Sequence, residues 1–130
     1  MSIQVATRLS GGVCILTPTG AMTIGSGCEQ IRETLMRQYE TGSHHLLIDC
    51  ANLTIVDSAG LGEIVAGYSA IARRGGSLKL LHPTPRLREL LKTTRLDLLL
   101  ESHDDERAAI DSFSNGADLK AQQALNDFLK

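Results

Sequence analysis

The sequence predicts an α/β fold with a mixed, mostly parallel sheet of about five strands and about four helices. Short apolar runs typical of strands alternate along the chain with longer segments in which apolar residues recur at helical spacing. A helix between two consecutive strands is the usual connection of a parallel pair. Only Ser10-Gly11-Gly12 separates the first two runs. We therefore expect those two strands to form an antiparallel hairpin at the N-terminal edge of the sheet.

The first half of the domain is predicted from residue alternation and turn residues. Residues 3–9 alternate between apolar and polar, which indicates a strand with one solvated face. Residues 13–17 are almost continuously apolar and predict a buried strand, which Pro18 and a following glycine should end. Residues 26–29 have the spacing of a capping box and predict the start of a helix that Gly42 closes.

The second half continues the same alternation of strands and helices. In chain order we expect a buried strand at residues 46–50, a helix from Ser58 to about Arg74, a strand at residues 78–81, a helix from Pro85 with Thr84 as its cap, a core strand at residues 96–100, and a helix with acidic residues 104–106 in its first turn that buries Ala109, Ile110 and Phe113.

The length of 130 residues predicts one domain. We assign residues 1–114 to this domain and residues 115–130 to a C-terminal extension. Five apolar residues of the extension would share one face of a helix. They are Ala121, Ala124, Leu125, Phe128 and Leu129. This face fits a helix packed back on the domain and, as the alternative, a contact with a second copy or another protein.

Charge and composition exclude several classes of partner. The net charge of −2 argues against nucleic acid, which requires a basic face. No run of about 18 apolar residues is present, so we expect no membrane insertion. The N-terminus lacks the pattern of a secretory signal, and we therefore expect a cytoplasmic protein. Cys14, Cys28 and Cys50 lack metal-site spacing, so buried thiols are expected rather than a disulfide or a metal site.

The candidate functional segment is Asp57-Ser58-Ala59-Gly60-Leu61-Gly62, at the start of the second predicted helix. Asp57 or Ser58 would cap this helix, because an Asp or Ser oxygen accepts from its first free N–H groups. Gly60, Gly62 and Gly67 each cost a helix up to about 1 kcal/mol relative to alanine. A helix that keeps them should need close backbone approach or a bare surface near Ser58.

These six residues, preceded by residues 47–49 and followed by residues 75–81, resemble the STAS domain of anti-sigma factor antagonists, the anti-anti-sigma factors of bacteria. The resemblance extends from about Ile3 to Phe113. It implies that Ser58 is the phosphate acceptor for a partner protein kinase. By the same resemblance, the surface that binds the partner is expected at Thr23, Asp57, Ala59, Gly60, Leu61 and Gly62. Many family members carry an acidic residue where this chain has residues 20–23. Residues 23–27, Thr-Ile-Gly-Ser-Gly, match the arrangement of another part of the family.

The resemblance also implies a mechanism. The unphosphorylated protein would bind an anti-sigma factor that is itself a serine kinase, so that a sigma factor is released. Phosphorylation of Ser58 would end that complex, and a serine phosphatase acting on phospho-Ser58 would restore it. ATP and magnesium belong to the kinase, so the chain itself needs no cofactor and no catalytic residue. We expect a monomer or a weak homodimer.

Other functions fit the sequence less well. A nucleophile elbow requires Gly-x-Ser-x-Gly, but position 56 is valine, which argues against an enzyme. Residues 25–27 lack the lysine of a phosphate-binding loop. Asp49 and Asp57 lack a third converging group for metal binding or acid–base chemistry. The main alternative keeps the fold and changes the role, to a non-switching STAS module in a stressosome-like scaffold or a transporter-associated complex.

Overall fold

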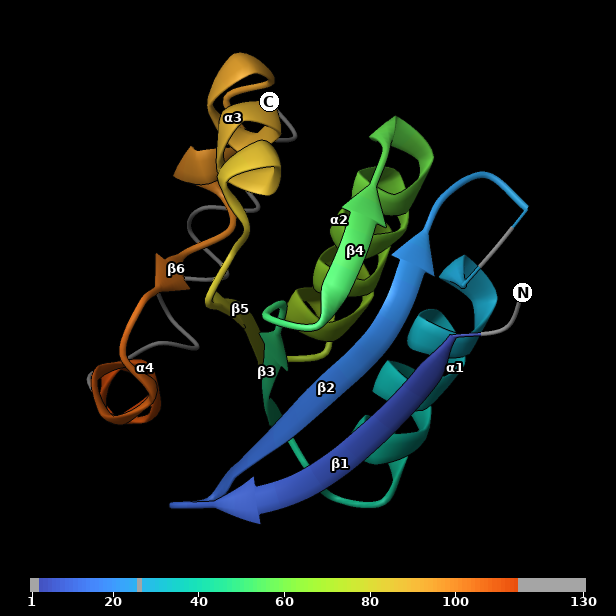
Figure 1. Cartoon of the computed structure of the whole chain (residues 1–130). Coiled ribbons are helices and arrows are strands. Elements are labelled where there is room, and N and C mark those ends of the chain that lie inside the picture. The colour runs from blue at the N-terminus through green and yellow to red at the C-terminus, as the bar shows by residue number, and fades with distance from the viewer. Residues whose placement is uncertain (1–2, 26, 115–130) are drawn as a thin grey trace.

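The computed structural model describes residues 3–25 and 27–114 (Figure 1). In chain order its elements are β1 (Gln4–Ser10), β2 (Val13–Met22), α1 (Cys28–Glu40), β3 (His45–Asp49), β4 (Leu53–Val56), α2 (Ser58–Arg73), β5 (Ser77–Leu81), α3 (Pro85–Thr93), the 3₁₀ helix η1 (Leu96–Leu98), β6 (Ser102–His103) and α4 (Glu106–Ser112). The predicted helix within residues 115–130 lies outside the described residues.

The strands form a six-stranded mixed sheet in the order β1-β2-β3-β5-β6, and β4 pairs with β2. β1 is antiparallel to β2, whereas the other pairs are parallel. The predicted α/β class, the antiparallel N-terminal edge and the four α-helices are therefore confirmed. The sixth strand, β4, was not predicted.

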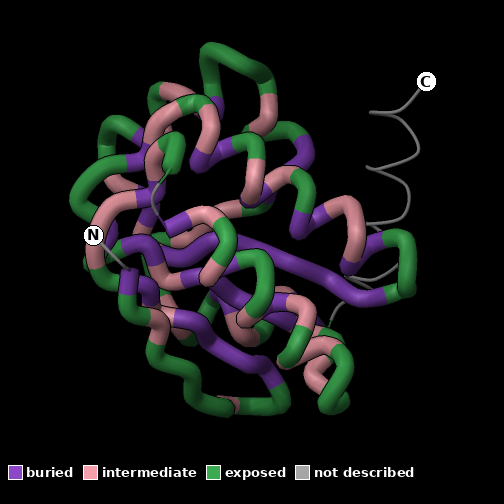
Figure 2. Tube along the Cα trace, turned by 90° about the vertical axis from the view of Figure 1, so that its right-hand side faces the viewer, coloured by how far each residue is buried: buried purple, intermediate pink, exposed green. Residues whose placement is uncertain are grey.

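The sheet has a large core on one face and a smaller one on the other. The main cluster combines alternate strand residues such as Cys14 and Leu16 with buried residues of α1, α2 and α3. The neighbouring Val13 and Ile15 point to the opposite face, where Ala109 and Phe113 around α4 cover them. Figure 2 shows that buried stretches of the chain pass through the interior of the domain, whereas exposed stretches lie at its periphery.

A lysine is buried beneath α4. Lys79 of β5 is only 7% exposed. Its Nζ donates to Ser112 Oγ at 2.7 Å, lies 2.9 Å from Glu101 Oε2 and sits 4.7 Å from the centre of the Phe113 ring. The ammonium group therefore ties the C-terminal end of α4 to β5 through Ser112 and Phe113, and its ion pair with Glu101 reaches the segment before β6.

The prediction that Pro18 ends the second strand is wrong, because β2 continues to Met22. Residues 14–16 of β2 pair with β3, and residues 20–22 pair with β4. Pro18 falls between these two stretches, where no parallel neighbour requires the N–H that proline lacks. The strand can therefore pass through the proline and reach the functional segment.

The prediction of a core strand at residues 96–100 is also wrong. Residues 96–98 form η1, preceded by Arg95 with a left-handed φ of 61°. Leu99 and Leu100 are buried as adjacent residues, and the strand follows later as β6. Hydrophobicity alone does not distinguish such a tight turn from a strand.

The helix starts were predicted with mixed success. Thr84 caps α3, since its Oγ accepts from Leu87 N at 3.2 Å, as predicted. Asp105 caps α4 in the same way. At α1 the cap position is Gly27, which has a left-handed φ of 84° and provides no side-chain cap, whereas Ser26 of the predicted capping box lies outside the described residues.

The three cysteines differ in burial. Cys14 and Cys50 are buried, as predicted for thiols that act as small apolar groups, and burial raises the pKa of Cys50 to about 12. Cys28 is partly exposed.

Within residues 3–25 and 27–114, no helix is long and apolar enough to cross a membrane.

Candidate functional site

Ser58 is exposed at the first position of α2. The preceding residue, Asp57, is the cap: its backbone is extended, and its Oδ1 accepts from Gly60 N at 2.9 Å. Of the two capping residues that the sequence allowed, Asp57 thus takes the role. Among the residues that the structure describes, none hydrogen-bonds to the Ser58 hydroxyl. The helix end is satisfied by Asp57, so the cap does not use the Ser58 hydroxyl.

Asp57 also connects α2 to the loop between β2 and α1. Its Oδ2 accepts from Ile24 N at 3.1 Å, and its backbone N–H donates to Met22 O at 3.2 Å. The hydrogen bonds from Gly60 and then Ile24 hold the pKa of the Asp57 carboxyl below its usual value. One carboxylate therefore keeps the segment that begins at Thr23 beside Ser58.

Two glycines allow this close packing. A Cβ on Gly60 would lie 2.2 Å from Met22 O, and a Cβ on Gly27 would lie 2.4 Å from Ala21 O. The start of α2 and the residue before α1 therefore both pack their backbones against the end of β2. Only glycine permits such a close approach. Gly67 packs similarly against α1, with Leu35 Cδ1 2.9 Å from the Cβ position.

Gly62 differs from these glycines. It is exposed, and a Cβ there would meet no atom within 4 Å. The structure therefore confirms both reasons expected for glycines in this helix: close approach at Gly60 and Gly67, and a bare surface at Gly62. A bare helix surface one turn after Ser58 gives another molecule room to approach.

The structure sorts the predicted site residues by exposure. Ser58 and Gly62 are exposed, whereas Thr23, Asp57 and Ala59 are partly buried. Gly60 and Leu61 are buried and shape the site from below. The predicted set therefore combines exposed residues with buried residues that hold the segment in place.

Two apolar residues near Ser58 were missed by the sequence interpretation. Ile24 is 82% exposed, and its N–H binds the residue next to Ser58. Ile55, in β4, is 58% exposed and precedes Ser58 by three residues. Large exposed apolar side chains beside an exposed hydroxyl are typical of a surface that binds another protein. Hydrophobicity could have suggested them, but only the structure shows that they are exposed.

Among the residues that the structure describes, the histidines contact groups other than Ser58. His82 Nδ1 lies 3.2 Å from Asp49 Oδ1, and His103 Nε2 lies 2.6 Å from Glu101 Oε2. His44 and His45 lie beside the rings of Tyr39 and Phe113. Asp49 also accepts from Ala51 N at 3.1 Å, so its carboxylate fixes a turn after β3. These contacts give the histidines and Asp49 structural roles.

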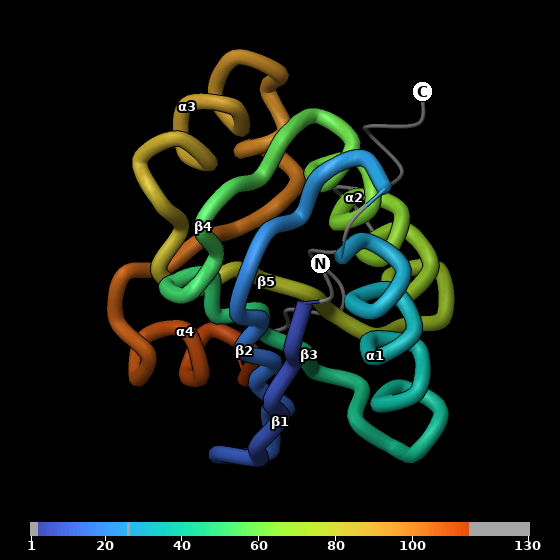
Figure 3. Tube along the Cα trace, turned by 45° about the vertical axis from the view of Figure 1, so that its right-hand side comes forward, coloured from blue at the N-terminus to red at the C-terminus, as the bar shows by residue number. Residues whose placement is uncertain are grey.

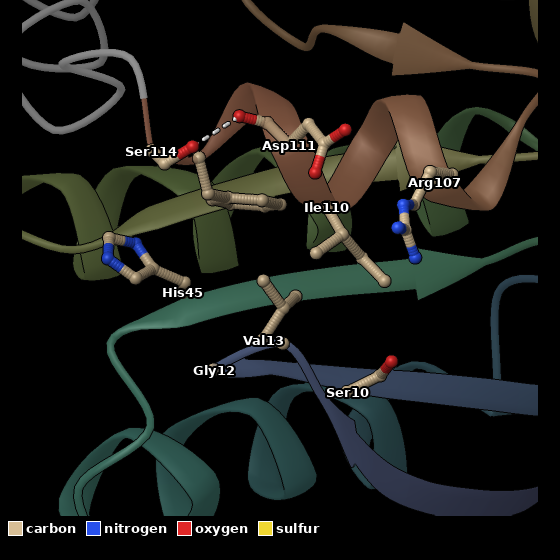
Figure 4. Close-up of a pocket in the computed structure, with 10 residues that line it drawn as sticks. Ser10, Gly12, Val13, His45, Arg107, Ile110, Asp111 and Ser114 are labelled. Carbon is tan, nitrogen blue, oxygen red and sulfur yellow. Dashed lines mark hydrogen bonds between the residues drawn. The ribbon is translucent and has the colours of Figure 1, made fainter.

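A separate cavity of about 420 Å³ lies between the β1–β2 hairpin, the start of β3 and α4 (Figure 4). Val13, His45 and Ile110 are among its lining residues, together with Arg107 and Asp111. None of the predicted site residues lines it. The surface around Ser58 is therefore distinct from this cavity.

Comparison with a known relative supports the resemblance seen in the sequence. The chain is 26% identical over 113 residues to the anti-sigma F factor antagonist of Paenibacillus polymyxa. This alignment covers 85% of the chain and 94% of that relative.

Solved structures share the fold at lower sequence identity. A Thermotoga maritima protein described as an anti-sigma factor antagonist matches with a TM-score of 0.78 at 20% identity, over 85% of this chain and 95% of its own. The Bacillus cell fate determinant SpoIIAA in its phosphorylated form matches with a TM-score of 0.63 at 21% identity, over 85% and 97%. A sulfate transporter family protein from Wolinella succinogenes matches with a TM-score of 0.63 at 16% identity, over 82% and 88%.

The family model of the STAS domain matches residues 4–109. This range includes every described strand and most of α4, as well as the segment around Ser58. With the sequence match, the mixed sheet and the exposed serine at the start of α2 in agreement, the chain belongs to the STAS domain family.

Proposed function

We propose that this protein is an anti-sigma factor antagonist that phosphorylation of Ser58 switches off. In its unphosphorylated form it binds an anti-sigma factor that is a serine kinase, and a sigma factor is thereby released. The kinase phosphorylates Ser58 and dissociates, and a serine phosphatase later removes the phosphate. The chain is a binding protein of the cytoplasm and not an enzyme, since the kinase supplies ATP and magnesium.

The observation that carries the proposal is the exposed hydroxyl of Ser58 beside a capping carboxylate. Asp57 satisfies the helix end, so phosphorylation of Ser58 removes no capping interaction. The named relative from Paenibacillus polymyxa and the phosphorylated SpoIIAA structure agree with a regulatory role of this kind.

In this proposal, one phosphate ends the complex by adding charge to the surface at Ser58. Ile24, whose N–H binds Asp57, and Ile55, three residues before Ser58, provide exposed apolar area close to this segment. A phosphate on Ser58 brings about −1.5 to −2 charges to it. Burying an unpaired dianion against a partner costs several kcal/mol, about a hundredfold or more in affinity. Within the free protein the phosphate stays in water at the positive end of α2. Phosphorylation therefore changes binding far more than it changes the fold.

The test is to recover the partners of Ser58 variants from the native cell. Tagged wild-type protein, Ser58→Ala and Ser58→Asp are captured, bound proteins are identified, and phosphorylated residues are mapped by mass spectrometry. Ser114→Ala, at an exposed serine after α4, is the matched control. We expect a serine-kinase ATPase bound to wild type, Ser58→Ala and Ser114→Ala, little of it bound to Ser58→Asp, and phosphate on Ser58 of the wild type.

The same experiment addresses the alternative role, a non-switching STAS module. The likeness to the sulfate transporter family protein favours this alternative at the level of the fold. Recovery of transport or scaffold subunits that bind all variants equally, with Ser58 unmodified, would contradict the proposed switch and support the module.

A further inference from the structure

β1 (Gln4–Ser10) is an edge strand with one free side. It pairs with β2 over all seven of its residues, and no described residue pairs with its other edge. Figure 1 shows β1 at the margin of the sheet, with α1 behind it and no strand beyond it. The N–H and C=O groups along that edge are available for pairing with another chain.

β1 lacks the features that usually protect such an edge. It contains no proline, no lysine and no bulge, since its register with β2 is continuous. Its single charged residue, Arg8, forms an ion pair with Glu106 of α4. Leu9 is 72% exposed near the end of the strand. An exposed leucine on an unprotected edge is a typical feature of a strand that pairs between molecules.

The α1 face of β1 is self-complementary. Val5, Thr7 and Leu9 lie opposite Pro18, Leu16 and Cys14 of β2. They therefore share the face whose neighbours belong to the main core. Val5 is partly buried against that core at one end of the strand, whereas Leu9 is exposed at the other.

We propose that β1 pairs with β1 of a second copy of this chain, antiparallel and about a two-fold axis at Thr7. This register places Leu9 of each copy opposite Val5 of the other, on the α1 face. Leu9 is thereby covered in both copies. Apolar cross-strand pairs of this kind stabilise a sheet. On the other face Arg8 lies opposite Ala6, so no like charges meet.

Neighbouring registers do not give this match. With the axis one residue later, at Arg8, the two arginines would face each other, which destabilises a strand pair. With the axis one residue earlier, at Ala6, Leu9 would lie opposite Ile3, which precedes β1 and is 5% exposed. The axis at Thr7 is thus the one of these three that buries Leu9 and keeps the charges apart.

The test substitutes Thr7, because in the proposed dimer Thr7 of one copy lies opposite Thr7 of the other. We expect wild type to show a concentration-dependent monomer–dimer equilibrium in sedimentation velocity. Thr7→Lys and Thr7→Glu should each raise the dissociation constant roughly fivefold or more, because like charges then face each other. An equimolar mixture of the two variants should recover the dimer as a heterodimer, visible by native mass spectrometry.

Thr19→Lys and Thr19→Glu are the matched controls, since Thr19 is exposed on β2 opposite Gln4 and away from the free edge. They should dimerise like wild type, and circular dichroism should show that all variants are folded. Monomeric wild type at every concentration, unchanged association of the Thr7 variants, or failure of the mixture to dimerise would each overturn the proposal.

Discussion

At the scale of single residues, the geometry of the site depends on Asp57, whose two carboxylate oxygens accept hydrogen bonds from different segments. One accepts from Gly60 at the start of α2, and the other accepts from Ile24 in the loop after β2. Asparagine can cap a helix but has a single carbonyl oxygen, so it cannot reproduce both contacts in this way. The aspartate is therefore needed for the placement of the loop as well as for the cap.

Asp57→Asn is expected to lower the melting temperature at neutral pH. Because folding lowers the pKa of this carboxyl below its ordinary value of 3.8, the ionised form is the one that stabilises the fold. Its contribution is present above that ordinary pKa and is lost as the pH falls through the lower folded value. The stability difference between wild type and Asp57→Asn should thus be constant from pH 7 to about pH 5 and shrink at lower pH. Thermal unfolding across pH checks this, and a difference that grows on acidification would contradict it.

Ser58→Asp is expected to shift the melting temperature by less than about 5 °C in either direction. The positive end of α2 favours the added negative charge, whereas the Asp57 carboxylate opposes it. Ser58→Ala measures the loss of the hydroxyl without added charge. A fall of tens of degrees for Ser58→Asp would show that phosphorylation acts by unfolding the domain and not through the partner surface.

At the scale of elements, the end of β2 positions the whole site. β4 pairs with its last residues, Gly60 of α2 presses on Met22, and Gly27 before α1 presses on Ala21. The main strands and helices could be predicted from hydrophobic spacing, and the position of Ser58 at a helix start from its motif. β4 could not be predicted, because its four residues are buried at the ends and exposed in the middle, without strand alternation.

Gly60 and Gly62 offer a matched pair of substitutions in one helix. Gly60→Ala should lower the free energy of unfolding by about 2 kcal/mol or more, because its Cβ would collide with a backbone carbonyl. Gly62→Ala should raise it by about 0.5–1 kcal/mol, because its Cβ meets open space and alanine favours a helix. Urea unfolding measures both. Equal effects of the two substitutions would contradict the close packing at Gly60.

At the scale of the whole molecule, the two faces of the sheet are covered unequally. The helices α1, α2 and α3 contribute buried residues to the main core, whereas α4 covers a smaller cluster and the buried Lys79. Figure 3 shows α1 and α2 on one side of the strands and α4 on the other. The sequence predicted the helix at α4 and its contacts through Ala109 and Phe113. It could not predict the burial of Lys79, because a lysine within an apolar strand indicates a solvated position until its partners are known.

Lys79→Ala is expected to lower the free energy of unfolding by about 2–3 kcal/mol, because it removes the buried side-chain stem and the contacts to α4. Lys79→Met keeps most of the stem and should cost less than about 1 kcal/mol, since Ser112 Oγ still donates to Ala109 O. Urea unfolding of both variants checks the difference. Equal losses for the two variants would show that the charge and not the packing of the stem holds α4, since both variants remove the ammonium group.

The pairing of β4 with the end of β2 has a consequence for protein engineering. Val56 lies opposite Met22, and the next residue, Asp57, binds both Met22 and Ile24 through its main chain and side chain. A graft of the six-residue motif onto the start of an unrelated helix would keep the sequence. It would lose the strand pairing and the hydrogen bonds that join Asp57 to Met22 and Ile24. To transplant the geometry around Ser58, a designer has to carry both strand ends and the loop between β2 and α1 along with the helix.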